Sequence, residues 1–144
     1  MGALGVIGAV AVHILVNVDV DDLERAIGFY TTALGLRLGR RLFDGSVAEM
    51  LGASSKIYLM AKTAGSVPFP GASSRDYRRH WTPVHLDFEV DDVAAAVELA
   101  LAAGAKLEGP IQSFSWGQQA TLSDPFGHGF CVVRFSSQGY DAVA

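Results

Sequence analysis

The chain has 144 residues, of which half are hydrophobic and 18% are charged, and its formal net charge is −4. This length suits one compact domain or two half-domains that share a core. The negative charge argues against nucleic acid as a partner, because proteins that bind it present an excess of Lys and Arg. The single cysteine, Cys131, excludes an intrachain disulfide and a zinc site built from several cysteines.

The apolar start of the chain, residues 1–18, does not have the pattern of a targeting or membrane segment. It lacks the basic residues that open a secretory signal. It is also too short to span a bilayer, and His13 interrupts it. We therefore expect a cytoplasmic protein that has no membrane as a partner.

The first half of the chain predicts a strand, a helix and three more strands. Residues 9–20 are rich in Val and Ile, and Asp21 with Glu24 has the spacing of a capping box that begins a helix. Apolar residues then recur at helical spacing up to Gly35, a typical helix end, at Leu23, Ala26, Ile27, Tyr30 and Leu34. Strands are expected at 36–43, 46–51 and 56–61, with Asp44-Gly45 as a hairpin turn.

The second half repeats this plan. Phe-Glu-Val-Asp-Asp-Val at 88–93 echoes Val-Asp-Val-Asp-Asp-Leu at 18–23. A strand at 83–90 precedes a helix that begins after Asp91 and ends at Gly104, and further strands are expected at 105–108, 116–123 and 129–136. The repeat predicts an α+β fold of two tandem βαβββ modules, in which cupped mixed sheets carry the helices on the outside.

The module boundaries follow from the composition. The first module covers residues 1–61, and a linker rich in Pro, Gly and Ser covers 62–82. The second module covers 83–136, and the tail 137–144 is expected to fray. Arginines and His80 crowd the end of the linker, either as a solvated charged loop or as a lid over an anionic substrate.

Two motifs accompany the repeat: Leu-Glu-Arg-Ala-Ile-Gly-Phe-Tyr at 23–30 and Asp-Pro-Phe-Gly-His at 124–128. Together they resemble the vicinal oxygen chelate superfamily, which includes glyoxalase I, bleomycin-resistance proteins and extradiol dioxygenases. The resemblance covers roughly residues 9–136. It implies the tandem βαβββ fold, but this fold carries both enzymes and binding proteins.

The resemblance also implies a metal site at four strand positions, which here fall on Leu15, Tyr58, His85 and Cys131. Leucine cannot bind a metal, and neutral tyrosine is a poor ligand. We therefore expect no cofactor and no metal at the usual site. The alternative is a divalent ion held by His13 and His85, which would need a bulge or a register slip, because His13 lies two residues before Leu15.

Strand alternation places several polar side chains on one inward face. The residues expected to bind a ligand are His13, Tyr58, His85, Asp87, Trp116 and Cys131. A pocket that mixes such groups with Leu, Met and Phe is typical of a site for a small organic molecule. The structural alternatives are that the polar groups satisfy one another and that Trp116 caps the core.

Three functions remain open from the sequence. The chain is expected to be a metal-free protein that binds a small organic molecule, similar in kind to bleomycin-resistance proteins. The alternative is a metal-dependent lyase, isomerase or dioxygenase with an atypical His-based site, and the third possibility is an inert scaffold that dimerises. A homodimer is expected in any case, because the edges of open sheets need to be covered.

Overall fold

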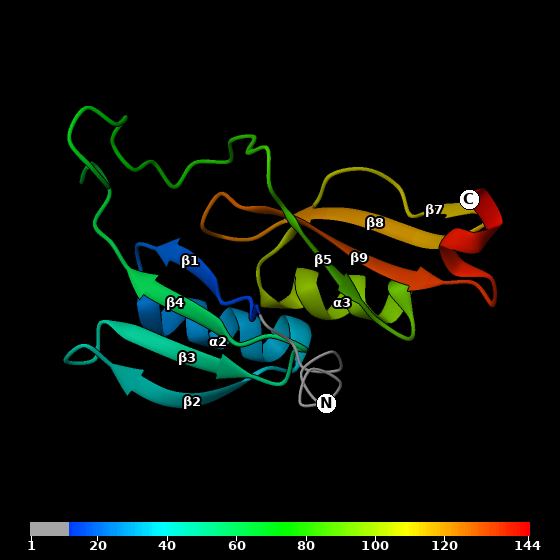
Figure 1. Cartoon of the computed structure of the whole chain (residues 1–144), viewed down its shortest axis with the longest axis horizontal. Helices are drawn as coiled ribbons and strands as arrows, with labels where there is room; N and C mark the ends of the chain where they lie inside the picture. Colours follow the sequence, from blue (N-terminus) through cyan, green and yellow to red (C-terminus); the bar gives the residue numbers. More distant parts are fainter. Residues whose placement is uncertain (1–11) are drawn as a thin grey trace, which may run out of the picture.

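The computed structural model describes residues 12–144, and its first half forms one sheet covered by one helix (Figure 1). The order of elements is strand, helix and three strands, as the sequence predicts. They are β1 (Val16–Val20), α2 (Leu23–Leu34), β2 (Arg37–Leu42), β3 (Val47–Leu51) and β4 (Ile57–Ala61). Asp44 and Gly45 form the expected hairpin turn between β2 and β3, with positive φ angles of 55° and 85°.

The second half repeats this order and adds one strand. Its elements are β5 (Leu86–Glu89), α3 (Val93–Ala103), β6 (Lys106–Leu107), β7 (Gln112–Phe114), β8 (Gly117–Ser123) and β9 (Gly129–Phe135). The strand β7 was not predicted, because it lies at the edge of the sheet and its three residues are exposed, so it lacks the apolar alternation of a strand. The tail is not frayed, because a short 3-10 helix covers Gly139–Val143.

The two sheets share one topology. The strand order is β1-β4-β3-β2 in the first and β5-β9-β8-β6 in the second, with β7 paired to β8. In each sheet the strand before the helix pairs in parallel with the last strand of the module, and the other pairs are antiparallel. The α+β fold of tandem βαβββ modules with mixed sheets is therefore confirmed.

The helix caps lie one residue later than the sequence analysis placed them. Asp22, not Asp21, caps α2 and accepts a hydrogen bond from the backbone N–H of Arg25. Asp92, not Asp91, caps α3 in the same way through Ala95. An N-cap carboxylate bonds the amide of the third helical residue, so the second Asp of each pair is the one in place.

Two strands are shorter than expected. The first was predicted over residues 9–20, but residues 12–15 have no regular structure, and residues 9–11 lie outside the described part of the chain. The fifth was predicted from residue 83 but begins at Leu86. Strand pairing explains where both strands begin. The first residue that pairs with the neighbouring strand is Val16 in β1 and Leu86 in β5.

Alternation along the strands decides which side chains the helices cover. Val16, Val18 and Val20 of β1 pack on the hydrophobic core beneath α2. Asn17 and Asp19 therefore point to the opposite side of the sheet, which we call the open face. In β9, Phe130 and Val132 belong to the core. The helices α2 and α3 meet near the middle of the molecule (Figure 1).

Besides the helix pair, polar contacts join the modules at the 124–128 turn. The hydroxyl of Tyr30 on α2 donates a hydrogen bond to the carboxylate of Asp124, and both residues are buried. Nε2 of His128 lies 2.7 Å from the carbonyl oxygen of Asp19 in β1.

In the part of the chain that the structure describes, no helix is long and apolar enough to cross a membrane.

Candidate functional site

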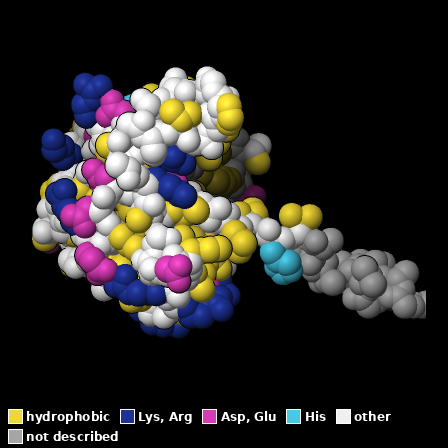
Figure 2. Space-filling model, turned by 90° about the vertical axis from the view of Figure 1, so that its left-hand side faces the viewer, with side chains coloured by type: hydrophobic (Ala, Val, Ile, Leu, Met, Phe, Trp, Pro, Cys, Tyr) yellow, Lys and Arg dark blue, Asp and Glu magenta, His cyan; other side chains and the backbone are white. Residues whose placement is uncertain are grey.

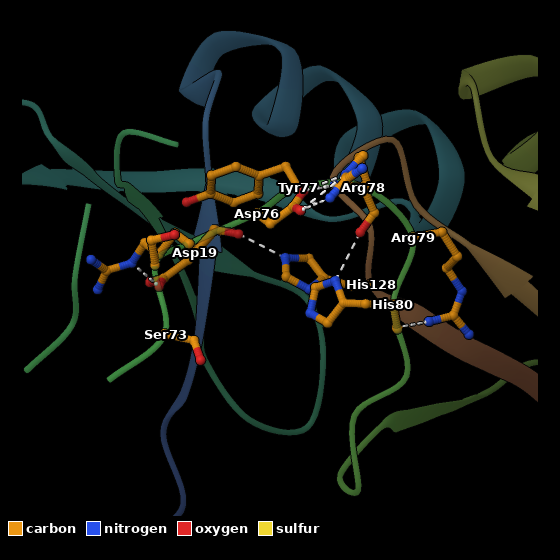
Figure 3. A pocket seen from close by; sticks show the side chains of 10 residues that line it. Asp19, Ser73, Asp76, Tyr77, Arg78, Arg79, His80 and His128 are labelled. Atoms are coloured by element: carbon orange, nitrogen blue, oxygen red, sulfur yellow. Dashed lines mark hydrogen bonds and ion pairs between the residues drawn. The ribbon is translucent and has the colours of Figure 1, made fainter. Parts of the chain in front are cut away.

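The last part of the linker is largely exposed to solvent, but it also contacts the body of the protein. Residues 73–80 enclose a cavity of about 520 Å³ with Asp19 and His128, and we call it the linker cavity (Figure 3). The Tyr77 hydroxyl donates a hydrogen bond to the Lys62 carbonyl oxygen at 2.7 Å. Gly127 lies directly beneath the linker, since a Cβ there would be 2.5 Å from the Arg78 carbonyl oxygen.

The arginines of the linker are all paired with carboxylates. Arg75 Nε lies 2.7 Å from Asp19, Arg79 binds Glu108 at the same distance, and Arg78 binds Asp76 at 2.6 Å. The Arg78 guanidinium and backbone N–H lower the pKa of Asp76 to about 2. An anionic substrate would have to displace these carboxylates, so the structure does not favour the anion lid.

Two histidines of the linker cavity were not among the expected site residues. The rings of His80 and His128 meet edge to face, with centroids 6.4 Å apart (Figure 3). His80 Nδ1 lies 2.8 Å from the Arg78 carbonyl oxygen. The sequence shows His128 only as a turn residue, and nothing in the pattern indicates that β1 passes beside that turn.

A second cavity, the central groove, separates the two sheets. It has a volume of about 400 Å³ and lies between β1 and β5, which are edge strands of their own sheets. Tyr30, Phe88 and Phe130 line it with Val84, while His85 and His128 add polar groups. An apolar groove with a few polar side chains is the usual form of a small-molecule site.

A third cavity, the His85 pocket, lies on the open face of the second sheet. It has a volume of about 240 Å³ and is lined by His85, Cys131, Gln119 and Thr121, with Trp81 and Thr82 from the linker. His85 Nε2 lies 3.1 Å from Oδ1 of Asp87. The ligand atoms of His85, Asp87 and Cys131 all lie within 4.8 Å of one another. The structure thus gathers three of the six expected site residues.

The Cys131 thiol is buried among polar neighbours. The Gln119 amide donates to its sulfur at 3.6 Å, and the Thr121 hydroxyl lies 3.5 Å away. Burial raises the pKa of Cys131, and the nearby Asp87 carboxylate adds to this effect. A nucleophilic cysteine needs the opposite shift, so the pocket does not have the chemistry of a thiolate nucleophile.

Tyr58 lies on the other sheet and lines neither of the two cavities that contain His85. Its hydroxyl donates to the buried Glu49 carboxylate at 3.1 Å. Arg40 binds the same carboxylate through two hydrogen bonds, of 2.8 and 3.0 Å. These hydrogen bonds, led by that of Arg40, lower the pKa of Glu49 to about 2. Arg40, Glu49 and Tyr58 thus hydrogen-bond with one another. This arrangement is the structural alternative to a ligand-binding role for Tyr58.

The other two expected site residues lie apart from His85. Trp116 stacks on Phe114 with ring centroids 5.2 Å apart and also contacts Phe135 and Tyr140. This cluster is at the far end of the β8–β9 hairpin from Cys131. His13 is exposed in the segment before β1.

The match to a family model decides the family. A model described as a glyoxalase-like domain matches residues 15–133. The chain belongs to this family. Solved structures described as glyoxalase/bleomycin resistance proteins share its fold, and the resemblance to the vicinal oxygen chelate superfamily is confirmed.

Three relatives illustrate the range of the family. Mb0911c of Mycobacterium bovis is 31% identical over 131 residues, which cover 88% of this chain and 82% of that protein. The anthracycline biosynthesis protein DauV of Streptomyces sp. (strain C5) is 29% identical over 90% of this chain, and the chain spans 43% of DauV. TnmS3 of Streptomyces sp. CB03234, an antibiotic-binding protein, is 26% identical with a TM-score of 0.63, covering 89% of this chain and 98% of TnmS3.

The residues of this glyoxalase-like domain do not fit the four-position metal site that the superfamily implies. Leu15 has no donor atom, lies before β1 and is 61% exposed. The Tyr58 hydroxyl is used by Glu49 on the first sheet. Of the four positions, only His85 and Cys131 lie together, and two ligands do not form the four-ligand site.

Proposed function

We propose that this glyoxalase-like domain binds a small organic molecule in the central groove and the His85 pocket, without a metal at the four usual positions of the superfamily. The observation that carries the proposal is that the two cavities share His85, Thr82, Gly129 and Phe130. A ligand that fills the groove would therefore reach the polar end formed by His85 and Cys131. The unpaired Cys131 thiol suits a reducing compartment, and we place the protein in the cytoplasm.

The relatives support an organic ligand. TnmS3 is described as an antibiotic-binding protein, and DauV as an anthracycline biosynthesis protein. The groove suits an amphipathic aromatic compound, because Tyr30, Phe88 and Phe130 offer ring surfaces and His85 offers a hydrogen-bonding group.

The second candidate function is a metal-dependent enzyme of the same superfamily. One observation favours it: His85, Asp87 and Cys131 present three possible metal ligands around one point. His13, the other histidine of the expected pair, is not part of that group. His13 lies outside β1, where strand geometry does not hold it beside His85.

Ligand binding is tested by a thermal-shift screen of amphipathic aromatic compounds that includes anthracyclines. At 100 times its Kd, a ligand adds about 2.7 kcal/mol and should raise the melting temperature by about 5–10 °C. His85→Ala should abolish the shift. His80→Ala is the matched control, because His80 is an exposed histidine that lines neither cavity. His128→Ala is not a control, because His128 lines the groove.

Two outcomes of this screen would change the proposal. An undiminished shift in His85→Ala would place the ligand elsewhere and refute the site. If Tyr58→Phe also abolished the shift, the ligand would have to span the open faces of both sheets. That result would restore Tyr58 to the site expected from the sequence.

We also propose that the protein is a homodimer. Ile14, Leu15 and Val84 are 70%, 61% and 78% exposed, and they lie before β1 and before β5. Figure 2 shows further hydrophobic side chains on the face seen from the left of Figure 1. Burying such side chains against a second copy is favourable, and the edges of β1 and β5 gain cover.

Sedimentation at micromolar concentration should therefore give twice the mass of one chain. Val84→Asp should shift the equilibrium toward the monomer, because the new charge would have to be buried. Thr63→Asp is the matched control on an exposed residue of the linker. A monomeric wild-type chain at all concentrations would contradict the dimer.

A further inference from the structure

The open face of the second sheet places three different metal ligands around one point. We propose that His85, Asp87 and Cys131 bind one borderline-soft divalent ion of the zinc type, within the second module alone. This differs from the four positions of the superfamily, because Leu15 and Tyr58 take no part and Asp87 supplies the third ligand. The inference does not rest on the proposed organic ligand.

Strand register brings the three ligands together. His85 lies one residue before β5 and Asp87 lies within it, and the 3.1 Å distance from His85 Nε2 to Asp87 Oδ1 shows that the two side chains lie together. Asp87 is also the register partner of Cys131 across the parallel β5–β9 pair. Neighbouring strands lie about 4.8 Å apart. One ion placed between the two strands could therefore contact the imidazole, the carboxylate and the thiolate.

The separations fit tetrahedral coordination with small side-chain adjustments. Bonds of about 2.0–2.3 Å in a tetrahedral site separate ligand atoms by about 3.3–3.8 Å. The His85–Asp87 distance is 3.1 Å, and all three ligand atoms lie within 4.8 Å of one another. The side chains of His85 and Asp87 are 53% and 42% exposed, so both have room to adjust around an ion.

The chemistry of the ligands selects the ion. Thiolate and imidazole favour zinc-type ions over magnesium or calcium, and a carboxylate is an accepted third ligand. The thiol of Cys131 would release its proton to solvent when the ion binds. Two anionic ligands then balance the charge of a divalent ion.

The surroundings of Cys131 provide the contacts that support a metal-bound thiolate. The Gln119 amide donates to the sulfur, and the Thr121 hydroxyl lies beside it. Hydrogen bonds of this kind orient metal ligands and stabilise their charge. A fourth coordination position would face the His85 pocket, whose volume of about 240 Å³ admits water or a small ligand.

The experiment uses Co²⁺ as the probe on the full chain, purified without a histidine tag. We expect one Co²⁺ per chain, a thiolate-to-cobalt charge-transfer band, and displacement of the ion by Zn²⁺. Cys131→Ser should remove the band. Asp87→Asn, at an exposed site that tolerates substitution, should weaken binding by at least about tenfold, and His85→Ala should do the same.

Control variants separate this site from the alternatives. His80→Ala and Tyr58→Phe should bind Co²⁺ as the wild-type chain does, and melting curves should show that every variant is folded. The proposal is overturned if no Co²⁺ binds, or if His85→Ala and Asp87→Asn bind as tightly as wild type. Equal weakening by Tyr58→Phe and Asp87→Asn would also overturn it, because the ion would then bridge both sheets.

Discussion

Replacing Asp124 with alanine should lower the free energy of unfolding by about 3 kcal/mol, because three hydrogen bonds to a buried carboxylate are lost together. Oδ1 accepts the backbone N–H groups of Phe126 and His128 at 2.8 and 2.9 Å. Oδ2 accepts the Tyr30 hydroxyl from the other module. The melting temperature should fall by about 6–12 °C, measured by calorimetry or circular dichroism.

Asp124→Asn is the matched control, because the amide oxygen can still accept the two backbone N–H groups of the turn. It should cost about 1 kcal/mol. Tyr30→Phe removes only the hydrogen bond from Tyr30 to Asp124 and should cost about 1–2 kcal/mol of unfolding free energy. A double-mutant cycle of Tyr30→Phe with Asp124→Ala should show coupling of about 1 kcal/mol or more. Additive effects would mean that the bond does not tie the modules together.

Alkaline pH gives an independent check on the same contact. Burial, and then the charge of Asp124, raise the pKa of Tyr30 well above its usual range. Above pH 10 the tyrosine therefore ionises in the unfolded chain before it ionises in the folded one, and stability falls by about 1.4 kcal/mol for each pH unit. The advantage of wild type over Tyr30→Phe should be constant below pH 10 and shrink above it. A constant difference up to pH 11 would contradict this.

Replacing Gly127 with alanine should cost about 3 kcal/mol, from a strained backbone and a steric clash together. The φ angle of Gly127 is 88°, which side chains rarely adopt. A Cβ would also lie 2.5 Å from the carbonyl oxygen of Arg78 and 2.8 Å from that of Tyr77. The linker would have to move away from the turn, so the linker cavity would change shape with the loss of stability.

Gly71 provides a matched control for the backbone conformation. Its φ angle is 87°, and a Cβ there meets nothing within 4 Å. Gly71→Ala should therefore cost only the strain of a positive φ, about 1 kcal/mol. Both variants are compared by chemical denaturation. Equal costs at the two positions would show that the linker does not press on the turn.

The repeated pattern determined most of the fold. Apolar alternation and helical spacing are local signals, and they predicted both helices and eight of the nine strands of the described residues. The same parity placed Asp87 and Cys131 on one open face, where the structure brings them together. β7 was missed because its three residues are exposed and carry no periodic signal.

The site depended on contacts that strand parity does not specify. Parity alone placed Tyr58 and His85 on one inward face, but the two residues belong to separate modules. Tyr58 bonds Glu49 on the first sheet, whereas His85 lines the central groove and the His85 pocket. The linker was ambiguous for a related reason: the sequence does not show that its arginines pair with Asp19, Asp76 and Glu108. His128 lines the linker cavity and the central groove because the 124–128 turn packs against β1.

The sequence by itself determined the two βαβββ modules, their caps to within one residue, and the side of each strand on which the polar residues lie. The tertiary structure decided which of those residues meet: His85 with Asp87 and Cys131, and Tyr58 with Glu49. The physical reason is the separation along the chain of the residues that interact. Helix and strand patterns arise from neighbours a few residues apart, whereas the cavities arise where β1, the linker and the 124–128 turn pack together across the length of the chain.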